Sequence, residues 1–287
     1  IFEGLKAYRG TDDKIYLFRP TDNLKRMNDS ATRMCMPEIP VDVVFSAMKK
    51  LVALDKSWVP RAEGATLYIR PAMIASEAGL GVRPAKQYLF FIINCPVGAY
   101  YPEGFNPVKI FVTDTYVRAV AGGVGNVKTA GNYAASIMAA VEAQNQGYTQ
   151  VLWLDAIERR YIEEVGTMNI FFLIDDELIT PPLTGSILPG ITRDSVLRLT
   201  KDWGLKVSEK RITIDDVLAA NEKGSLQEIF GTGTAAVISP VGELNYKGQV
   251  CTINNGKTGT LARKLFTELQ AIQNGHKKDP YGWVVEV

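Results

Sequence analysis

The amino-acid sequence predicts a mixed α/β protein with two domains. Its 287 residues are long for one domain and comfortable for two. Patterns typical of strands and of helices occur in both halves of the chain. Between the halves, residues 98–104 are rich in Gly, Pro and Tyr, as connections often are. We therefore expect a small N-terminal domain at 1–97, an interdomain loop at 98–104 and a large domain at 105–287.

In the N-terminal half, strand and helix periods follow one another. The expected elements are two short strands within 1–18, a helix starting at 19–22, a helix at 41–54, and strands at 65–72 and 88–93. Thr21 or Asp22 is expected to cap the first helix. The strand at 88–93 is almost purely apolar, which predicts burial on both of its faces.

For two arginines of this half, we ask whether the side chain is solvated or has a binding role. The strand at 65–72 alternates, so that Tyr68 and Arg70 share one face. That face is either exposed sheet surface or an anion pocket, and the pattern alone favours the surface because most arginines are solvated. Arg26 lies off the apolar stripe of the first helix, and the same argument predicts a solvated side chain.

The C-terminal half also contains strand and helix patterns. Expected strands lie at 108–113, 150–155, 170–174, 205–211, 226–230 and 237–241, and expected helices at 133–146, 190–203, 214–220 and within 259–275. A turn at 231–236 follows the fifth of these strands.

The stretch from Gly122 to Tyr133 organises the chain. Three glycines lead to Lys128, and the sequence Gly-Asn-Tyr then opens a helix of small residues. Glycines let a chain or a ligand approach closely. The loop alone favours a solvated surface lysine. The alternative is an amine held at a fixed place for covalent chemistry with a carbonyl group.

Three further features carry charge or bind it. Glu163 and Glu164 precede an apolar strand, where an unpaired carboxylate is costly to bury, so either both are surface turn residues or one has a cationic or protonated partner. The helix start at Ile191-Thr192 and the turn at 231–236 both present backbone N–H groups to an anion. For the helix, the ordinary alternative is a plain start capped by Thr192.

Composition narrows the chemistry. His276 is the only histidine and the three cysteines are far apart, which argues against His-based triads, disulfide frameworks and metal clusters. The net charge of +1 gives no indication of a nucleic-acid or membrane partner. Acid–base chemistry must then use Lys, Tyr, Asp, Glu or a cofactor. Pyridoxal phosphate fits this set, since its aldehyde needs a lysine, its ring nitrogen a carboxylate and its phosphate an anion site.

Seven motifs resemble those of the branched-chain amino acid aminotransferase family, a fold-type IV pyridoxal phosphate family. They are residues 2–8 (FEGLKAY), 17–20 (LFRP), 67–71 (LYIRP), 131–133 (GNY), 164–169 (EVGTMN), 188–193 (LPGITR) and 230–235 (FGTGTA). They follow the family's order and cover nearly the whole chain. The resemblance implies two α/β domains with the cofactor at their interface.

The resemblance also implies roles at the cofactor. Lys128 binds the cofactor aldehyde covalently and moves the proton from the substrate's α-carbon. Glu164, not Glu163, pairs with the ring nitrogen, and Tyr133 with the phenolic oxygen. The residues implied at or near the phosphate are Arg26, Ile191, Thr192, Thr234 and Arg118.

For the substrate, the resemblance implies that the amides of Thr234 and Ala235 receive its carboxylate. Tyr68 and Arg70 shape that side of the pocket, and Arg70 serves the distal carboxylate of glutamate. The apolar side chain is lined by Phe2 and Thr167. No metal is expected.

The expected protein is therefore a homodimeric, cytoplasmic transaminase of leucine, isoleucine and valine with 2-oxoglutarate. Ala236 and Ser239 stand where mammalian members carry a Cys-x-x-Cys, so no thiol switch is expected there. The chain begins without Met in the middle of an element, which predicts a preceding segment. The rival interpretations are a relative acting on D-amino acids, an aminodeoxychorismate lyase, and a catalytically silent binding protein.

Overall fold

A computed structural model describes residues 1–98 and 105–287. Residues 99–104 of the expected interdomain loop lie outside this described part, and the expected domain limits stay a prediction. The chain forms two compact units. The first comprises the described residues of Ile1–Tyr100, Val127–Ala130 and Glu268–Val287, and the second those of Tyr101–Asn126 and Gly131–Thr267. The mixed α/β class is confirmed.

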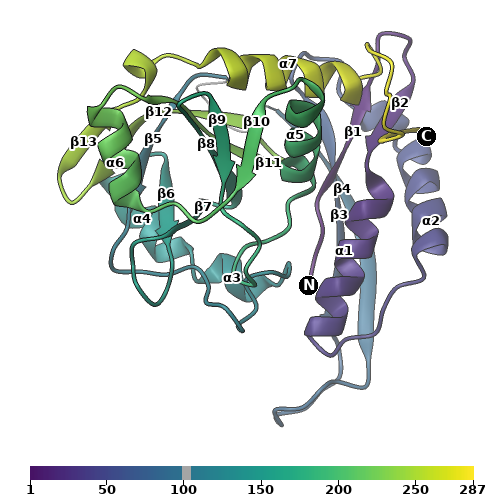
Figure 1. Cartoon of the computed structure of the whole chain (residues 1–287). Coiled ribbons are helices and arrows are strands. Elements are labelled where there is room, and N and C mark those ends of the chain that lie inside the picture. Colours follow the sequence, from purple (N-terminus) through teal and green to yellow (C-terminus); the bar gives the residue numbers. More distant parts are fainter. Residues whose placement is uncertain (99–104) are drawn as a thin grey trace. The chain divides into compact units, whose positions relative to one another are not determined.

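The first unit is built on an antiparallel five-stranded sheet. Its order is β14 (Val284–Glu286), β2 (Ile15–Phe18), β1 (Leu5–Arg9), β3 (Thr66–Ala75) and β4 (Tyr88–Val97). The helices α1 (Pro20–Arg33) and α2 (Val41–Leu54) run next to one another in Figure 1. Apolar side chains from β1, β2, β3, α1 and α2 form one core, which joins the helices to one face of the sheet.

Strand β3 follows the alternation expected from its sequence. Leu67 and Ile69 are fully buried in that core, whereas Tyr68 and Arg70 point to the other face and are half-buried. Lys6 of β1 lies directly opposite Tyr68 in the pairing of the two strands. Because residues paired across antiparallel strands lie on the same face, Lys6, Tyr68 and Arg70 share one side of the sheet.

Two expectations for this unit are wrong. Helix α1 has Arg19 as its N-cap, in a left-handed conformation with φ of 50°, and neither Thr21 nor Asp22 caps it. The reason is that Pro20 suits the first helical position, so the helix begins before both candidates. Strand β4 is not buried on both faces, since Leu89 and Ile93 are 52% and 57% exposed. Among the residues that the structure describes, it lies at the edge of the sheet and pairs with β3 alone, which its apolar composition does not reveal.

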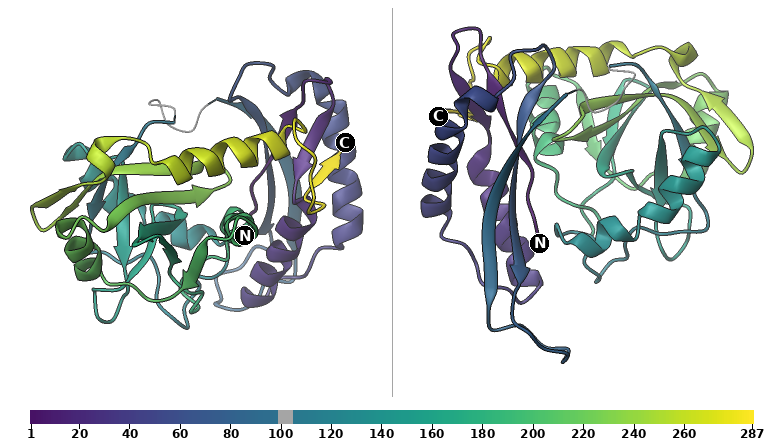
Figure 2. Two further views of the ribbon diagram at one scale, coloured as in Figure 1. Left: turned by 45° about the horizontal axis from the view of Figure 1, so that its top comes forward. Right: turned by 180° about the vertical axis from the view of Figure 1, so that it is seen from behind.

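The second unit contains a mixed nine-stranded sheet. The strands are β5 (Val108–Val112), β6 (Gln150–Leu154), β7 (Ile162–Val165), β8 (Met168–Ile174), β9 (Glu177–Thr180), β10 (Lys206–Glu209), β11 (Leu226–Gly233), β12 (Val237–Tyr246) and β13 (Gln249–Thr252). Strand β8 pairs with both β11 and β7, so the order β8-β11-β12-β5-β6-β7 closes into a ring (Figure 2). Apolar side chains from most of these strands form its core.

The helices of the second half are α3 (Ala130–Ala134), α4 (Ile137–Asn145), α5 (Ile191–Asp202), α6 (Ile214–Glu222) and α7 (Thr260–Gln273). The single helix expected at 133–146 is wrong, because α3 and α4 are separated at Ala135 and Ser136. The Ser136 hydroxyl donates to the Tyr133 carbonyl at 2.7 Å, a local bond that competes with the helical ladder. The turn expected from Gly231 begins later, since Gly231 still pairs with Ser239 in the sheet.

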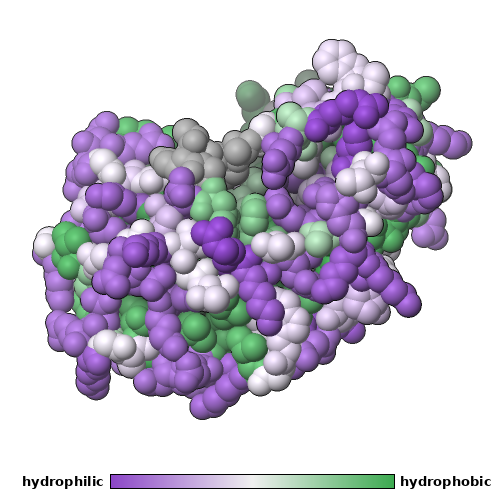
Figure 3. All heavy atoms as spheres, turned by 90° about the horizontal axis from the view of Figure 1, so that it is seen from above, coloured by the Kyte–Doolittle hydropathy of each residue, from purple (hydrophilic) through white to green (hydrophobic). Residues whose placement is uncertain are grey.

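The surface visible in Figure 3 is mostly hydrophilic, with hydrophobic side chains interspersed. Within the described ranges, none of the helices has the length and apolar character needed to cross a membrane.

Candidate active site

Lys128 is fixed through its backbone within the first unit. Its N–H donates to the Ser30 hydroxyl at 3.0 Å, and its carbonyl accepts from the Phe2 N–H at 3.1 Å. Its Nζ atom lies 4.8 Å from the centre of the Phe2 ring. The lysine is half-buried. The structure therefore favours an amine held at a defined place over a lysine on an unconstrained surface loop.

Arg26 is buried in an ion pair, so the solvated side chain predicted from the helix pattern is wrong. Its Nε and Nη2 atoms donate to the two oxygens of Glu3 at 2.8 and 2.9 Å. Glu3 is fully buried, and its carboxylate also accepts from the Gly4 N–H at 3.2 Å. One turn further along α1, the Ser30 hydroxyl donates to the Arg26 carbonyl at 3.0 Å. Ser30 thus connects the turn of Arg26 to Lys128.

Tyr68, Arg70 and Phe2 form a cluster in the same unit. Arg70 Nη2 donates to the Tyr68 hydroxyl at 2.8 Å, and the Arg70 guanidinium lies 4.6 Å from the centre of the Phe2 ring. A Cβ atom on Gly4 would collide with the Tyr68 hydroxyl, so only glycine permits this approach. Arg70 Nε is buried without a hydrogen-bond partner, which leaves one donor for an anionic ligand.

Glu164 is the buried acid of the second unit, at 3% exposure. It forms an ion pair with Arg118, and its Oε1 atom accepts from the Asn169 amide at 3.2 Å. Arg118 also donates to the Ser186 carbonyl at 2.7 Å. Of the two interpretations of the acids at 163 and 164, the structure supports partnered burial. Both lie inside strand β7, not in a surface turn.

Four sequence-predicted residues of the second unit line one small cleft. They are Arg118, Tyr133, Glu164 and Thr167. Asn132, which also lines it, donates to the Val124 carbonyl at 2.8 Å and so ties the start of α3 to the Gly-rich loop. The cleft therefore combines a buried carboxylate, a guanidinium and a phenol.

Helix α5 begins beside the same carboxylate. Its N-cap is Gly190, which has no side chain to cap it, so the capping role expected for Thr192 is wrong. Asn169 reaches the Leu188 carbonyl at 2.9 Å, and a Cβ atom on Gly190 would collide with its amide oxygen. Ile191 and Thr192 form the first turn, and Thr192 is buried. Asn169 therefore links Glu164 to this helix start.

Thr234 and Ala235 lie in the turn that joins β11 to β12, and both are half-buried. The turn follows Thr232, whose hydroxyl is buried without a hydrogen-bond partner. Whether Thr234 and Ala235 bind a carboxylate or a phosphate stays a prediction.

Sequence reasoning missed the residues that hold these groups in place. Glu3, Ser30, Asn169 and Ser186 are each buried and polar, at 5% exposure or less. Two of them carry a signal: Glu3 and Asn169 are polar residues next to apolar strand positions, where burial without a partner is costly. Ser30 and Ser186 carry no signal that sequence alone would reveal.

The first unit thus holds a lysine amine at a defined place, and the second buries a carboxylate with charged and polar partners. The family model for amino-transferase class IV matches residues 1–244. The chain belongs to this family.

The chain is similar to other members along its whole length. Branched-chain-amino-acid aminotransferase 2 of Bacillus subtilis (strain 168) is 56% identical over 287 residues, which are 100% of this chain and 79% of that protein. The branched-chain aminotransferase of Thermoproteus uzoniensis with norvaline has a TM-score of 0.85 at 28% identity, covering 100% of this chain and 89% of that one. The T.th. branched-chain amino acid aminotransferase with pyridoxamine 5'-phosphate has a TM-score of 0.84 at 29% identity, covering 99% of this chain and 88% of that one.

Proposed function

We propose that this class IV aminotransferase interconverts branched-chain L-amino acids and 2-oxoglutarate with branched 2-oxo acids and L-glutamate. The amino acids are leucine, isoleucine and valine, and the cofactor is pyridoxal phosphate, used in a ping-pong sequence. The observation that carries the proposal is the buried Glu164 carboxylate, paired with Arg118 in a cleft that Tyr133 also lines.

The described residues fit this cofactor. When bound, pyridoxal phosphate supplies an electron sink for the electron pair that remains after the α-proton leaves the substrate. Glu164 suits the ring nitrogen, because its Arg118 and Asn169 partners favour the charged carboxylate, and a charged carboxylate holds a proton on that nitrogen. Tyr133 lines the same cleft, and its hydroxyl suits the phenolic oxygen as a donor.

Lys128 is the proposed catalytic residue. Its amine would hold the cofactor aldehyde and, once displaced by the amine of the substrate, would move the proton from the substrate's α-carbon. The backbone bonds to Ser30 and Phe2 support this role, because they restrict where the amine can lie. The Phe2 ring beside Nζ adds a contact that also restricts where the amine can lie.

The phosphate is proposed to bind at the start of α5, through Ile191 and Thr192, and to Thr234 and Arg26. A helix start without a side-chain cap offers N–H groups and a favourable dipole to an anion. Glu3 holds Arg26 by two of its nitrogens and so fixes the direction of the guanidinium. Arg118 is proposed to act near the phosphate and to position Glu164.

The substrate is proposed to lie between an apolar wall and a polar one. Phe2 and Thr167 would contact the branched side chain, and the Thr234 and Ala235 amides its carboxylate. An apolar pocket distinguishes one methylene by only about 1–3 kcal/mol, so overlapping use of leucine, isoleucine and valine follows. The unpartnered Nε of Arg70, with Tyr68 beside it, supports a role for Arg70 at the second carboxylate of glutamate.

The proposal includes a homodimer in the cytoplasm. Light scattering on the purified protein tests the assembly, and twice the chain mass is the expected result. Fractionation of the producing cells tests the location.

A substrate panel tests the activity. With 2-oxoglutarate as acceptor, L-leucine, L-isoleucine and L-valine are expected to give glutamate, and Lys128→Ala is expected to give none. Preference for D-leucine, or release of pyruvate from aminodeoxychorismate without an acceptor, would replace the proposal with one of the two related activities. Failure of every amino compound with cofactor bound would favour a binding protein.

A further inference from the structure

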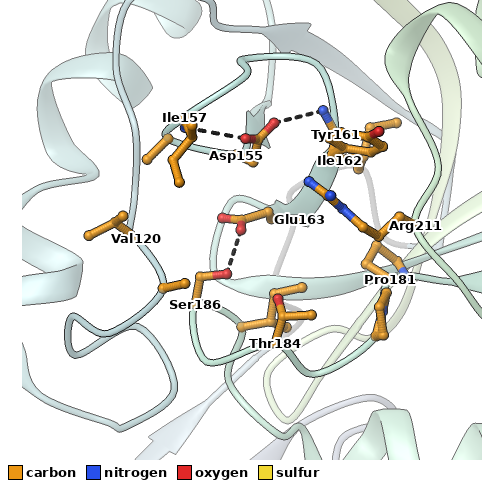
Figure 4. Close-up of a pocket in the computed structure, with 14 residues that line it drawn as sticks. Val120, Asp155, Ile157, Tyr161, Ile162, Glu163, Pro181, Thr184, Ser186 and Arg211 are labelled. Carbon is orange, nitrogen blue, oxygen red and sulfur yellow. Dashed lines mark hydrogen bonds between the residues drawn. The ribbon is translucent and has the colours of Figure 1, made fainter.

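A second cavity lies in the second unit, next to the cleft of Glu164 but on the other side of strand β7. Its volume is about 250 Å³. Figure 4 shows its walls, which come from the segment just before the Gly-rich stretch at Val120, the β6–β7 connection at Asp155 and Ile157, strand β7 at Glu163, and the segment after β9. None of the proposed catalytic steps uses this cavity.

Glu163 gives the cavity an unsatisfied acceptor. Its Oε1 atom accepts from the Ser186 hydroxyl, whereas its Oε2 atom is buried and has no hydrogen-bond partner. The residue is only 9% exposed, and burial raises the pKa of its carboxyl group. A buried carboxylate oxygen without a donor is unfavourable. A ligand that brings a positively charged donor would satisfy it.

The other acid of the cavity is already satisfied. The Asp155 carboxylate accepts from four backbone N–H groups, those of Ile157, Glu158, Arg160 and Tyr161, at 2.8–3.2 Å. It closes the loop between β6 and β7 and has no need of a ligand. The two carboxylates in Figure 4 therefore have different roles, one structural and one open to a donor.

Arg211 provides the opposite charge at the same cavity. Its guanidinium stacks on the Tyr161 ring, 3.4 Å from the ring centre, and its ion pair with Glu158 is long, at 3.5 Å. The side chain is half exposed and extends toward Glu163 in Figure 4. The wall also includes the apolar side chains of Val120, Ile157 and Pro181.

We propose that this cavity is a second binding site for a zwitterionic α-amino acid with an apolar side chain. Its ammonium group donates to Glu163 Oε2, its carboxylate binds Arg211, and its side chain packs against Val120 and Ile157. The choice of leucine as the ligand rests on the proposed function, because leucine is a substrate there. The cavity and its two charges do not rest on it.

The site is coupled to the active site through Ser186. The Ser186 hydroxyl donates to Glu163, and its carbonyl accepts from Arg118, which pairs with Glu164. A ligand that draws Glu163 toward itself moves the acceptor of the Ser186 hydroxyl. Ser186 then moves as well, and because its carbonyl accepts from Arg118, the geometry of the Arg118–Glu164 ion pair changes. This linkage makes the amino acid a regulator of the same enzyme that consumes it.

Calorimetry on the pyridoxamine form of the holoenzyme tests the binding site. In that form the cofactor already carries an amine, so L-leucine cannot react at the active site. We expect saturable binding of one leucine per chain. Glu163→Gln is expected to weaken it by about tenfold or more, because it removes the charge that the ammonium group needs. The control Glu63→Gln removes an exposed carboxylate and is expected to bind as the wild type does.

Arg211→Ala tests the orientation of the ligand. It is expected to weaken leucine by about tenfold but to leave binding of 3-methylbutylamine, which lacks the carboxylate, unchanged. Ala156→Trp adds bulk to the cavity wall without changing a charge, and is expected to abolish binding of both compounds. It keeps the test decisive if Glu163→Gln does not fold.

Absence of saturable leucine binding, or equal affinity of wild type and Glu163→Gln, would overturn the site. The coupling has its own readout: leucine is expected to change the near-ultraviolet absorption of the bound cofactor in the wild type and not in Ala156→Trp. Binding without this change would overturn the coupling. The substrate panel is read on the pyridoxal form with turnover, so its failure is distinguishable from the failure of this binding test.

Discussion

Each unit of the molecule contains a buried pair of one arginine and one glutamate, and the two pairs differ in what they leave open. In the first unit, both oxygens of Glu3 accept from Arg26. In the second, Arg118 divides its donors between Glu164 and backbone carbonyls, and Glu164 lines a cleft. Burial and ion pairing alone therefore do not identify a catalytic acid. A catalytic acid is identified by a cleft beside it that a ligand can enter.

The largest expected effect comes from breaking the Glu3–Arg26 pair of the first unit. Glu3→Ala leaves the Arg26 guanidinium buried and without its carboxylate, which is expected to lower the free energy of unfolding by about 3–5 kcal/mol. Urea denaturation followed by circular dichroism measures it. Glu286→Ala removes the exposed partner of Lys14 and should change the midpoint far less. Equal midpoints for wild type and Glu3→Ala would contradict a stabilising role for the pair.

The second effect falls on catalysis instead of stability. Glu164→Gln keeps the size of the side chain but removes the charge proposed to hold a proton on the cofactor ring, and turnover is expected to fall by about 10²–10³-fold. Steady-state rates with leucine and 2-oxoglutarate measure it. Glu163→Gln is the same change one residue earlier and should lower turnover much less. A larger loss in Glu163→Gln would mean that the two acids have been assigned in the wrong order.

The third effect concerns Lys6, a buried lysine on strand β1 in the five-stranded sheet of the first unit. Burial lowers its pKa from 10.5 to about 8. Between these values the unfolded chain holds the proton and the folded chain does not, so stability rises with pH from 8 to 10.5. The expected rise is about 2–3 kcal/mol, and Lys6→Met should lack it. Urea denaturation at pH 7.5, 9 and 10.5 gives the comparison, and parallel pH profiles for the two proteins would exclude the assigned burial effect.

The smallest effect tests the polar face of the same sheet. Tyr68→Phe removes the acceptor of the Arg70 bond. The freed guanidinium is expected to lose its direction and raise the KM for 2-oxoglutarate about fivefold, in keeping with the loss of one hydrogen bond to a charged group. The KM for leucine, which has no second carboxylate, should change less. A uniform change in both would place Tyr68 away from the distal carboxylate.

The first unit shows which structural elements sequence patterns can predict. Local periodicity predicted β1, β2, α2 and β3, because each buries one face and its pattern records that face. It predicted β4 as a strand but not the exposure of its apolar side chains, and it gave no sign of β14, which pairs with β2 from the other end of the chain. Edge position and long-range pairing are properties of the assembled sheet, and no segment encodes them alone.

The site was predictable in a similar, partial way. The Gly-rich stretch singled out Lys128, but its pattern favoured a surface lysine, and the bonds to Ser30 and Phe2 come from distant segments. Two adjacent acids in β7 are both buried, so periodicity cannot say which one meets a cofactor. The choice of Glu164 came from the family resemblance, and the structure adds its pairing with Arg118 and Asn169.

Lys128 and Glu164 are proposed to serve one pyridoxal phosphate. The most direct measurement is the absorption spectrum of the purified protein with added cofactor, before and after L-leucine, in the absence of any 2-oxo acid. We expect a visible band in the wild type that leucine converts to the near-ultraviolet band of the pyridoxamine form, and no such conversion in Lys128→Ala. Conversion retained in Lys128→Ala, or a wild-type protein that binds no cofactor, would contradict it.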